Sequence, residues 1–349
     1  MMIRCYIFLV LLISNFSNVV GDQIRFEEGQ SIVFLGDTFV ERAQEFGHLE
    51  ATFSSAFPSK NIKFRNLGWS ADTVRGLSRA GFDHLKARPG WDHLLNALKD
   101  SDPDWVVMGY GMAESFQGPE NTDSFTQGYK ELIKEIKGIS PEKPVHFIFL
   151  SPIAHEKIPG PLPNPQKHNQ DLKVYTEIIA DIASENNSRF INLFNFTRRY
   201  KGARQLTDNG IHLNGYGYSY VSDYIGRQLR FKSSTQVLRV PRTGEAVSRS
   251  ALPAHKVKVR GHAGLEDQIK YILRMNGEAV ALASGERWKS GVDVKMGKLS
   301  DSYEKLTNQI KAKNKLFFYR WRPQNNTYLF LFRKHEQGQN AREIPMFDP

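Results

Sequence analysis

The sequence predicts an α/β fold in which a parallel sheet carries helices on both faces. Short apolar runs alternate with stretches of helical periodicity about five times between residues 31 and 230. The runs are nearly continuous in apolar residues, which is typical of strands buried on both faces. The polar residues that could carry chemistry follow these runs, and the carboxyl ends of parallel strands form one edge of a sheet. We therefore expect a single site at that edge.

The first strand and helix provide the clearest local pattern. Residues 32–35 are apolar and run into Gly36-Asp37-Thr38, after which apolar residues recur at helical spacing. A buried strand, a tight turn and a helix N-terminus would place the Thr38 hydroxyl beside unpaired N–H groups that favour developing negative charge. The alternative is that Asp37 or Thr38 serves only as a helix N-cap.

The other expected elements follow in order along the chain. Proline-rich residues 158–165 predict a stiff loop, and residues 233–255 resemble a linker. The aromatic runs 316–322 and 328–333 either pair as a hairpin or line a groove on the main domain. Further strands are expected over 62–68, 105–111, 145–150 and 190–194, and helices over 91–98, 126–137, 172–186, 218–229, 265–275 and 299–314.

Composition places the chain among globular proteins that pass through a secretory route. It has 349 residues, of which 40% are hydrophobic and 24% charged. Residues 1–21 combine Arg4, a short apolar run and a small residue at the end, as in a signal peptide, so we expect a secreted or periplasmic protein; an uncleaved membrane anchor is the alternative. The only cysteine, Cys5, lies in that segment, and no other residue spacing indicates a metal site or a cofactor.

The positive charge is concentrated in the last third of the chain. The net charge is +10, and the segment from Lys232 onward holds 22 Lys+Arg against 11 Asp+Glu, which leaves the remainder nearly neutral. For a secreted chain this balance favours contact with an anionic polysaccharide or the cell envelope over nucleic acid.

Four loop motifs together resemble a known family. They are Gly36-Asp37-Thr38, Asn66-Leu67-Gly68, Gly111-Met112-Ala113-Glu114 and Asn209-Gly210-Ile211-His212-Leu213. Their order and spacing over residues 23–230 resemble the SGNH/GDSL hydrolases. The resemblance implies a flavodoxin-like, three-layer α/β/α fold, ester hydrolysis, Thr38 at the nucleophile position and His212 as general base. It also implies that the Gly68 and Thr38 N–H groups form an oxyanion hole. The basic, aromatic tail resembles a module that follows such domains in some large secreted bacterial proteins.

Three positions depart from the pattern of that family. Thr38 replaces serine, and its extra methyl restricts χ1. Ala113 replaces the asparagine that donates to the oxyanion, so Ser115 or Glu114 could take over a role in the site. Asn209 replaces the aspartate three residues before the histidine, with Asp208 as an alternative orienting group.

Two functions follow from these observations. The first is a secreted hydrolase that cleaves an acyl ester, such as an acetyl group on a carbohydrate, through Thr38 and His212. The second is a catalytically inactive protein of the same fold that binds glycan or cell envelope. In both, residues 1–21 form the signal peptide, residues 22–231 the hydrolase-like domain, and residues 232–349 a linker and a helical, aromatic extension. Asp72 and Arg75 are candidate substrate contacts, and His155 and His168 either line the rim of a pocket or are solvated.

Overall fold

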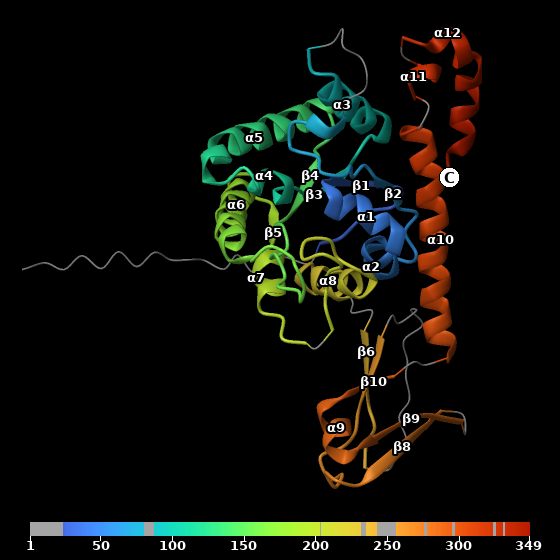
Figure 1. The fold of residues 1–349 in the computed structure, drawn as a ribbon. Coiled ribbons are helices and arrows are strands. Elements are labelled where there is room, and N and C mark those ends of the chain that lie inside the picture. The colour runs from blue at the N-terminus through green and yellow to red at the C-terminus, as the bar shows by residue number, and fades with distance from the viewer. Residues whose placement is uncertain are drawn as a thin grey trace, which may run out of the picture.

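The computed structural model contains a five-stranded parallel sheet flanked by helices (Figure 1). It describes residues 24–79, 87–202, 204–231, 235–242, 256–275, 278–294, 297–323, 326–330 and 332–349, so the expected signal peptide lies outside the described residues. The strand order is β2-β1-β3-β4-β5, and every pairing is parallel. The strands are β1 (Ser31–Gly36), β2 (Lys63–Asn66), β3 (Trp105–Gly109), β4 (His146–Leu150) and β5 (Arg189–Ile191).

Side chains that alternate along the strands build two separate cores, one on each face of the sheet. On β1, Ile32 and Phe34 belong to one core, whereas Val33 and Leu35 belong to the other. The first core is completed mainly by α1 (Thr38–Phe46), α2 (His48–Ala56), α7 (Leu193–Arg198) and α8 (Gly215–Gln228). The second is completed by α3 (Pro89–Ser101), α5 (Thr122–Ile139) and α6 (Gln166–Glu185). The predicted three-layer α/β/α fold is confirmed.

Short elements connect these layers. They are the 3₁₀ helices η1 (Leu77–Arg79) and η2 (Pro119–Asn121) and the four-residue helix α4 (Met112–Ser115). The strand predicted over 190–194 is too long, because β5 ends at Ile191 and α7 begins at Leu193. Asn192 caps this helix by accepting a hydrogen bond from the Asn195 N–H at 2.7 Å.

A small β-rich unit follows the main domain. Strands β6 (Thr235–Arg239), β7 (Lys256–Arg260) and β10 (Val292–Val294) form one sheet, and β8 (Lys270–Met275) pairs with β9 (Glu278–Ser284) as a hairpin. The helix predicted over 265–275 is wrong, because residues 270–275 form the first strand of that hairpin, in which Ile272 faces Leu282. The linker prediction fails over β6, and residues 243–255 lie outside the described part of the chain. Helix α9 (Gly285–Ser290) contributes Trp288 to the small core.

The long helix α10 (Gly297–Trp321) returns to the main domain and packs beside α1, α2 and β2 (Figure 1). It confirms the helix predicted over 299–314 and extends through residues 316–321. The hairpin alternative for the aromatic runs is therefore wrong, because Phe317 and Trp321 lie one helical turn apart and pack against the second core. The chain ends in α11 (Asn326–Leu329), α12 (Lys334–Gln337) and η3 (Gly338–Phe347).

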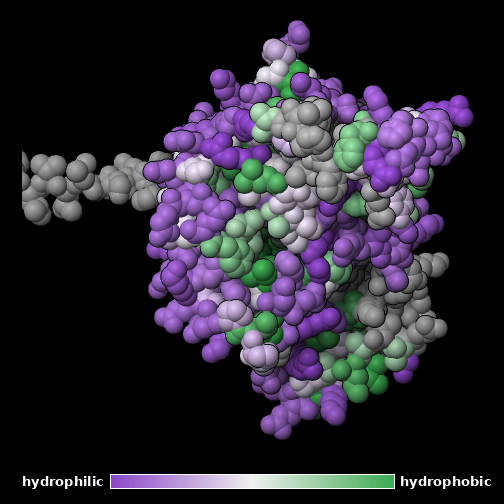
Figure 2. All heavy atoms as spheres, turned by 45° about the horizontal axis from the view of Figure 1, so that its top comes forward, coloured by the Kyte–Doolittle hydropathy of each residue, from purple (hydrophilic) through white to green (hydrophobic). Residues whose placement is uncertain are grey.

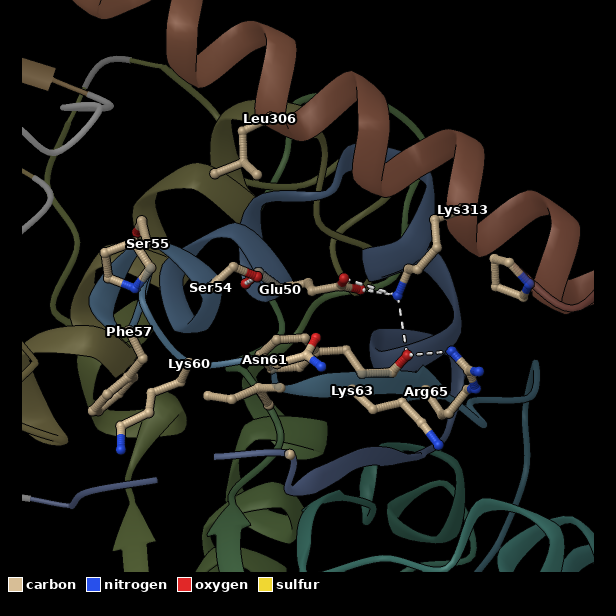
Figure 3. Close-up of a pocket in the computed structure, with 15 residues that line it drawn as sticks. Glu50, Ser54, Ser55, Phe57, Lys60, Asn61, Lys63, Arg65, Leu306 and Lys313 are labelled. Atoms are coloured by element: carbon tan, nitrogen blue, oxygen red, sulfur yellow. Dashed lines mark hydrogen bonds and ion pairs between the residues drawn. The ribbon is translucent and has the colours of Figure 1, made fainter. Parts of the chain in front are cut away.

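Helix α10 covers the edge of the sheet at β2. Figure 3 shows Lys313 reaching from α10 to the Glu50 carboxylate on α2, at 2.8 Å. Lys313 Nζ also donates to the Phe64 carbonyl at 3.1 Å, and Arg65 Nη1 donates to the same oxygen at 3.2 Å. A helix that covers an edge strand hinders its pairing with another strand.

Figure 2 shows a face that is mostly hydrophilic, on which hydrophobic side chains form scattered groups. Within the described residues, no helix has the combined length and hydrophobicity that crossing a bilayer requires.

Candidate active site

Thr38 stands at the first turn of α1, directly after β1. The turn is tight, because a Cβ on Gly36 would lie 2.2 Å from the Gly109 carbonyl oxygen on β3. Asp37 is the N-cap: its carboxylate accepts from the Phe39 N–H at 2.9 Å and from the Met112 N–H at 3.3 Å. Burial raises the pKa of the Asp37 carboxyl to about 7. Asp37 therefore does hold the turn, as the N-cap reading expects.

The Thr38 hydroxyl already has a hydrogen-bond partner. Its Oγ1 accepts from the Ala71 N–H at 2.8 Å, in the loop that follows β2. Within the described residues, no hydrogen bond joins Thr38 to His212. Both residues nevertheless line the same two adjoining spaces at the carboxyl ends of the strands, so the fold brings together the hydroxyl and the imidazole that the sequence predicts.

His212 lies in the loop before α8, and Asn209 fixes its ring. The Asn209 Oδ1 accepts from the N–H groups of Ile211, at 3.2 Å, and His212, at 2.9 Å. These two donors set the orientation of the amide, so its Nδ2 faces the His212 Nδ1 at 3.1 Å. An amide N–H can only donate, so Nδ1 accepts and the neutral ring carries its proton on Nε2. This is the opposite of the tautomer that an aspartate would select.

Asp208 does not take the place of the missing aspartate. Its carboxylate forms an ion pair with Arg42 Nη2 on α1 at 2.9 Å, and its own N–H donates to the His212 carbonyl. Burial, followed by the positive charge of Arg42, holds the pKa of His212 below its ordinary value. The imidazole is therefore neutral at physiological pH. Its proton lies on Nε2, however, and this nitrogen must be unprotonated for His212 to act as a general base.

One of the two expected oxyanion donors, the Gly68 N–H, is occupied. The Gly68 N–H donates to the Asn66 Oδ1 at 2.9 Å, and the Asn66 Nδ2 donates to the Val40 carbonyl at 2.7 Å. Gly68 packs against α1 so closely that a Cβ would lie 2.2 Å from the Glu41 backbone nitrogen. Ala113 has no polar side chain to donate from this side of the site.

Glu114 and Ser115 support the loop after β3. The Glu114 carboxylate accepts from the Val74 N–H at 2.9 Å and the Gly111 N–H at 3.1 Å, and burial raises its pKa to about 8. Ser115 Oγ contacts the Met112 carbonyl and the His168 Nε2, each at 2.8 Å. Both side chains are buried and held by these partners.

Other sequence candidates also form internal pairs. Asp72 forms a fully buried ion pair with Arg79 at 2.5 Å, and Arg75 pairs with Glu131 at 3.1 Å. His155 Nδ1 lies 3.0 Å from His168 Nδ1, so neither ring is simply solvated. Among the residues described, no group of His, Cys, Asp and Glu side chains is suited to hold a metal ion.

The sequence analysis missed Glu156, which fixes the loop that carries His212. Its carboxylate accepts from the N–H groups of Leu206, at 3.0 Å, and Thr207, at 2.8 Å, and from the Thr207 hydroxyl at 2.5 Å. The only available signal was its position shortly after β4, at the edge of the sheet where the other site residues gather.

Two spaces of very different size meet at Thr38 and His212. The smaller is about 20 Å³ and is lined mainly by apolar side chains, including Phe39, Met112 and Ile211. The larger is an open groove of about 610 Å³ between α1 and α10. Helix α10 contributes Lys311, Lys315, Phe318 and Tyr319 to its wall, which confirms that part of the aromatic tail lines a groove on the main domain.

The chain resembles a known family in sequence and known proteins in fold. A family model for GDSL-like lipase/acylhydrolases matches residues 30–220, more than half of the chain. A gut microbial diltiazem-metabolizing enzyme has a similar structure, with a TM-score of 0.56 and 14% identity over 93% of this chain and 88% of that one. A catalytic mutant of an acetylxylan esterase from Geobacillus stearothermophilus reaches a TM-score of 0.43 at 20% identity, covering 60% of this chain and 98% of its own. No curated protein matches the sequence.

Proposed function

Because the chain belongs to the GDSL-like lipase/acylhydrolase family, a family of ester hydrolases, we propose that it cleaves a short acyl ester with Thr38 as nucleophile and His212 as base. One observation carries the proposal: Thr38 and His212 share the junction between the small apolar hole and the open groove. An ester bound across this junction has its carbonyl beside the Thr38 hydroxyl. Its acyl end then lies in the small apolar space and its alcohol end in the open groove.

The volume of the smaller space indicates the size of the acyl group. A space of about 20 Å³ accommodates little more than one methyl-sized group. Acetyl is therefore the acyl group that fits, and the alcohol part of the ester occupies the groove.

The reaction follows from the placement of these groups. Thr38 Oγ1 attacks the carbonyl carbon while His212 accepts the hydroxyl proton, and the N-terminus of α1 favours the developing negative charge. The bond to the alcohol then breaks, and His212 returns the proton to the leaving oxygen. Water hydrolyses the acyl-threonine by the same route. His212 must first move its proton from Nε2 to Nδ1, against the Asn209 amide, so we expect a slow enzyme.

Kinetics with p-nitrophenyl esters test the proposal. We expect measurable hydrolysis of the acetate, weaker hydrolysis of the butyrate, and loss of both in Thr38→Ala and in His212→Ala. Thr38→Ser is the matched control, because it keeps the hydroxyl and removes only the methyl, and it should retain or raise the rate. Hydrolysis that is unchanged in both alanine variants would refute the assignment.

A second function is favoured by the internal hydrogen bonds of the site. The His212 Nδ1 accepts from the Asn209 amide and the Gly68 N–H donates to the Asn66 side-chain oxygen, so both groups are satisfied without a substrate. A catalytically inactive, glycan-binding protein would show no turnover of any acyl ester, together with salt-sensitive retention on an anionic polysaccharide.

We also propose that the chain is exported and divided as the sequence suggests. Residues 1–21 would be removed, residues 22–231 would form the hydrolase domain, and residues 232–349 would form the extension. N-terminal sequencing of protein recovered from the medium or periplasm tests the cleavage. An intact N-terminus on cytoplasmic protein would contradict it.

A further inference from the structure

We infer that the groove beside helix α10 recognises an anionic carbohydrate as the alcohol part of the ester. The inference rests on the proposed function, because it assumes that the acyl group enters the small hole. It assigns a substrate class to a surface that lies outside the motifs of the hydrolase family.

Helix α10 presents one stripe to the groove. Lys311, Lys315 and Phe318 follow one another at intervals of four and three residues, which places them on one helical face, and Arg322 follows directly after the last residue of the helix. The first three line the groove opposite Thr38 and His212. Arg322 continues the stripe and stacks on Trp69, with its guanidinium carbon 3.4 Å from the ring centroid.

The charges in the groove leave two lysines available for a ligand. Arg42 is paired with Asp208, and Glu41 is paired with Arg322 at 2.5 Å. Within the described residues, Lys311 and Lys315 have no ion-pair partner. Of the carboxylates that line the groove in that part of the chain, Glu45 also has no ion-pair partner. Like charges four residues apart repel on a helix, so an anion between the two ammonium groups would relieve a cost that the folded chain carries.

Aromatic side chains beside these lysines suit a sugar ring. Tyr319 lines the groove, and the Lys315 Nζ lies 6.0 Å from its ring centroid. A pyranose can place its C–H face on an aromatic ring while its carboxylate meets an ammonium group. The volume of about 610 Å³ is within the range of small-ligand sites, and the groove is open to solvent, so a chain of sugars can extend from it.

The test compares acetylated oligogalacturonate, which is acidic, with acetylated xylo-oligosaccharide, which is neutral. We expect a KM about tenfold lower for the acidic substrate at low salt, and a difference that shrinks as salt increases. The double variant Lys311→Gln/Lys315→Gln should raise KM for the acidic substrate by about the same factor, and it should change KM for the neutral substrate much less. Lys305→Gln is the matched control, because it removes the same charge from an exposed position of α10 outside the groove.

Three results would overturn the inference. They are equal KM values for the two substrates, an equal effect of the double variant on both, and an effect of Lys305→Gln as large as that of the double variant. If the protein hydrolyses no ester, the proposed function fails and the groove is tested by calorimetry with unacetylated oligogalacturonate and xylo-oligosaccharide. Preferential binding of the acid that is lost in the double variant supports the groove, and equal or absent binding overturns it.

Discussion

Replacing Asn209 with aspartate should activate the enzyme. In Asn209→Asp, one carboxylate oxygen keeps the two hydrogen bonds from the N–H groups of Ile211 and His212. The other oxygen takes the position of the amide nitrogen, 3.1 Å from the His212 Nδ1. A carboxylate only accepts hydrogen bonds, so Nδ1 must now carry the proton, and Nε2 becomes free to act as a base.

The expected gain follows from what the reverse change costs. Exchanging aspartate for asparagine in a serine-type triad lowers kcat by about 10⁴, or about 5 kcal/mol of transition-state stabilisation. The hydrogen bond between residues 209 and 212 is exposed to solvent, and the positive charge of Arg42 already acts on the ring. The carboxylate therefore contributes less than in a buried triad, and we expect a gain in kcat/KM of about 10²–10³.

The assay measures p-nitrophenyl acetate hydrolysis as a function of pH. The rate falls at low pH, where His212 becomes protonated. The introduced carboxylate favours the charged ring, so the pKa of His212 rises and this fall should move to higher pH in the variant. Asn209→Ala is the matched control, because it removes the amide without adding an acceptor. A gain that survives in Asn209→Asp/His212→Ala, or no gain at all, would refute the tautomer argument.

Three further predictions concern stability and the loop of the site. Glu156→Ala leaves three donors of the His212 loop without their acceptor and should lower unfolding free energy by about 1–3 kcal/mol in urea titrations, with a parallel loss of kcat; an unchanged midpoint would contradict this. Lys313→Met leaves the buried carboxylate that pairs with Lys313 without a countercharge, so it should lower the free energy of unfolding by about 2–4 kcal/mol. The exposed Lys305→Met should leave that free energy almost unchanged. Burial raises the pKa of Glu114 to about 8, so the protonated group stabilises the fold below pH 4 and this contribution is lost as the pH rises through 8. Thermal unfolding should therefore show wild type losing stability relative to Glu114→Gln between pH 5 and 8.5, and parallel curves would contradict the shift.

The sequence predicted the main fold because its signals are local. The first apolar run, Gly36 and the capping residue Asp37 act within a few positions of one another, and the structure confirms the junction that they predict. The secondary structure of the C-terminal tail was harder to predict, because the spacing of its aromatic residues fits both a helix and a strand. Phe317 and Trp321 satisfy a helical interval, but residues 316–322 are also apolar and aromatic enough for a strand. Packing against the main domain selects the helix. A short stretch of sequence carries no information about that tertiary contact.

The site shows the same limit at the level of single side chains. The sequence placed Asp208 and Asn209 side by side and left open which of them orients His212. The decision depends on Arg42, which draws the Asp208 carboxylate to α1 from 166 positions away in the chain. The role of Glu156 was equally hidden, because its three donors lie about 50 positions further along the chain.

The free site satisfies its own hydrogen-bonding groups, and this explains why a substrate must compete for it. The Gly68 N–H is held by Asn66, the Thr38 hydroxyl by the Ala71 N–H, and the His212 Nδ1 by Asn209. A substrate carbonyl gains the Gly68 N–H only after its bond to Asn66 opens, and the net gain from that donor is the difference between two similar hydrogen bonds. Low turnover would then arise from the occupied Gly68 N–H and the Nε2–H tautomer, since the fold keeps the threonine and the histidine at one junction.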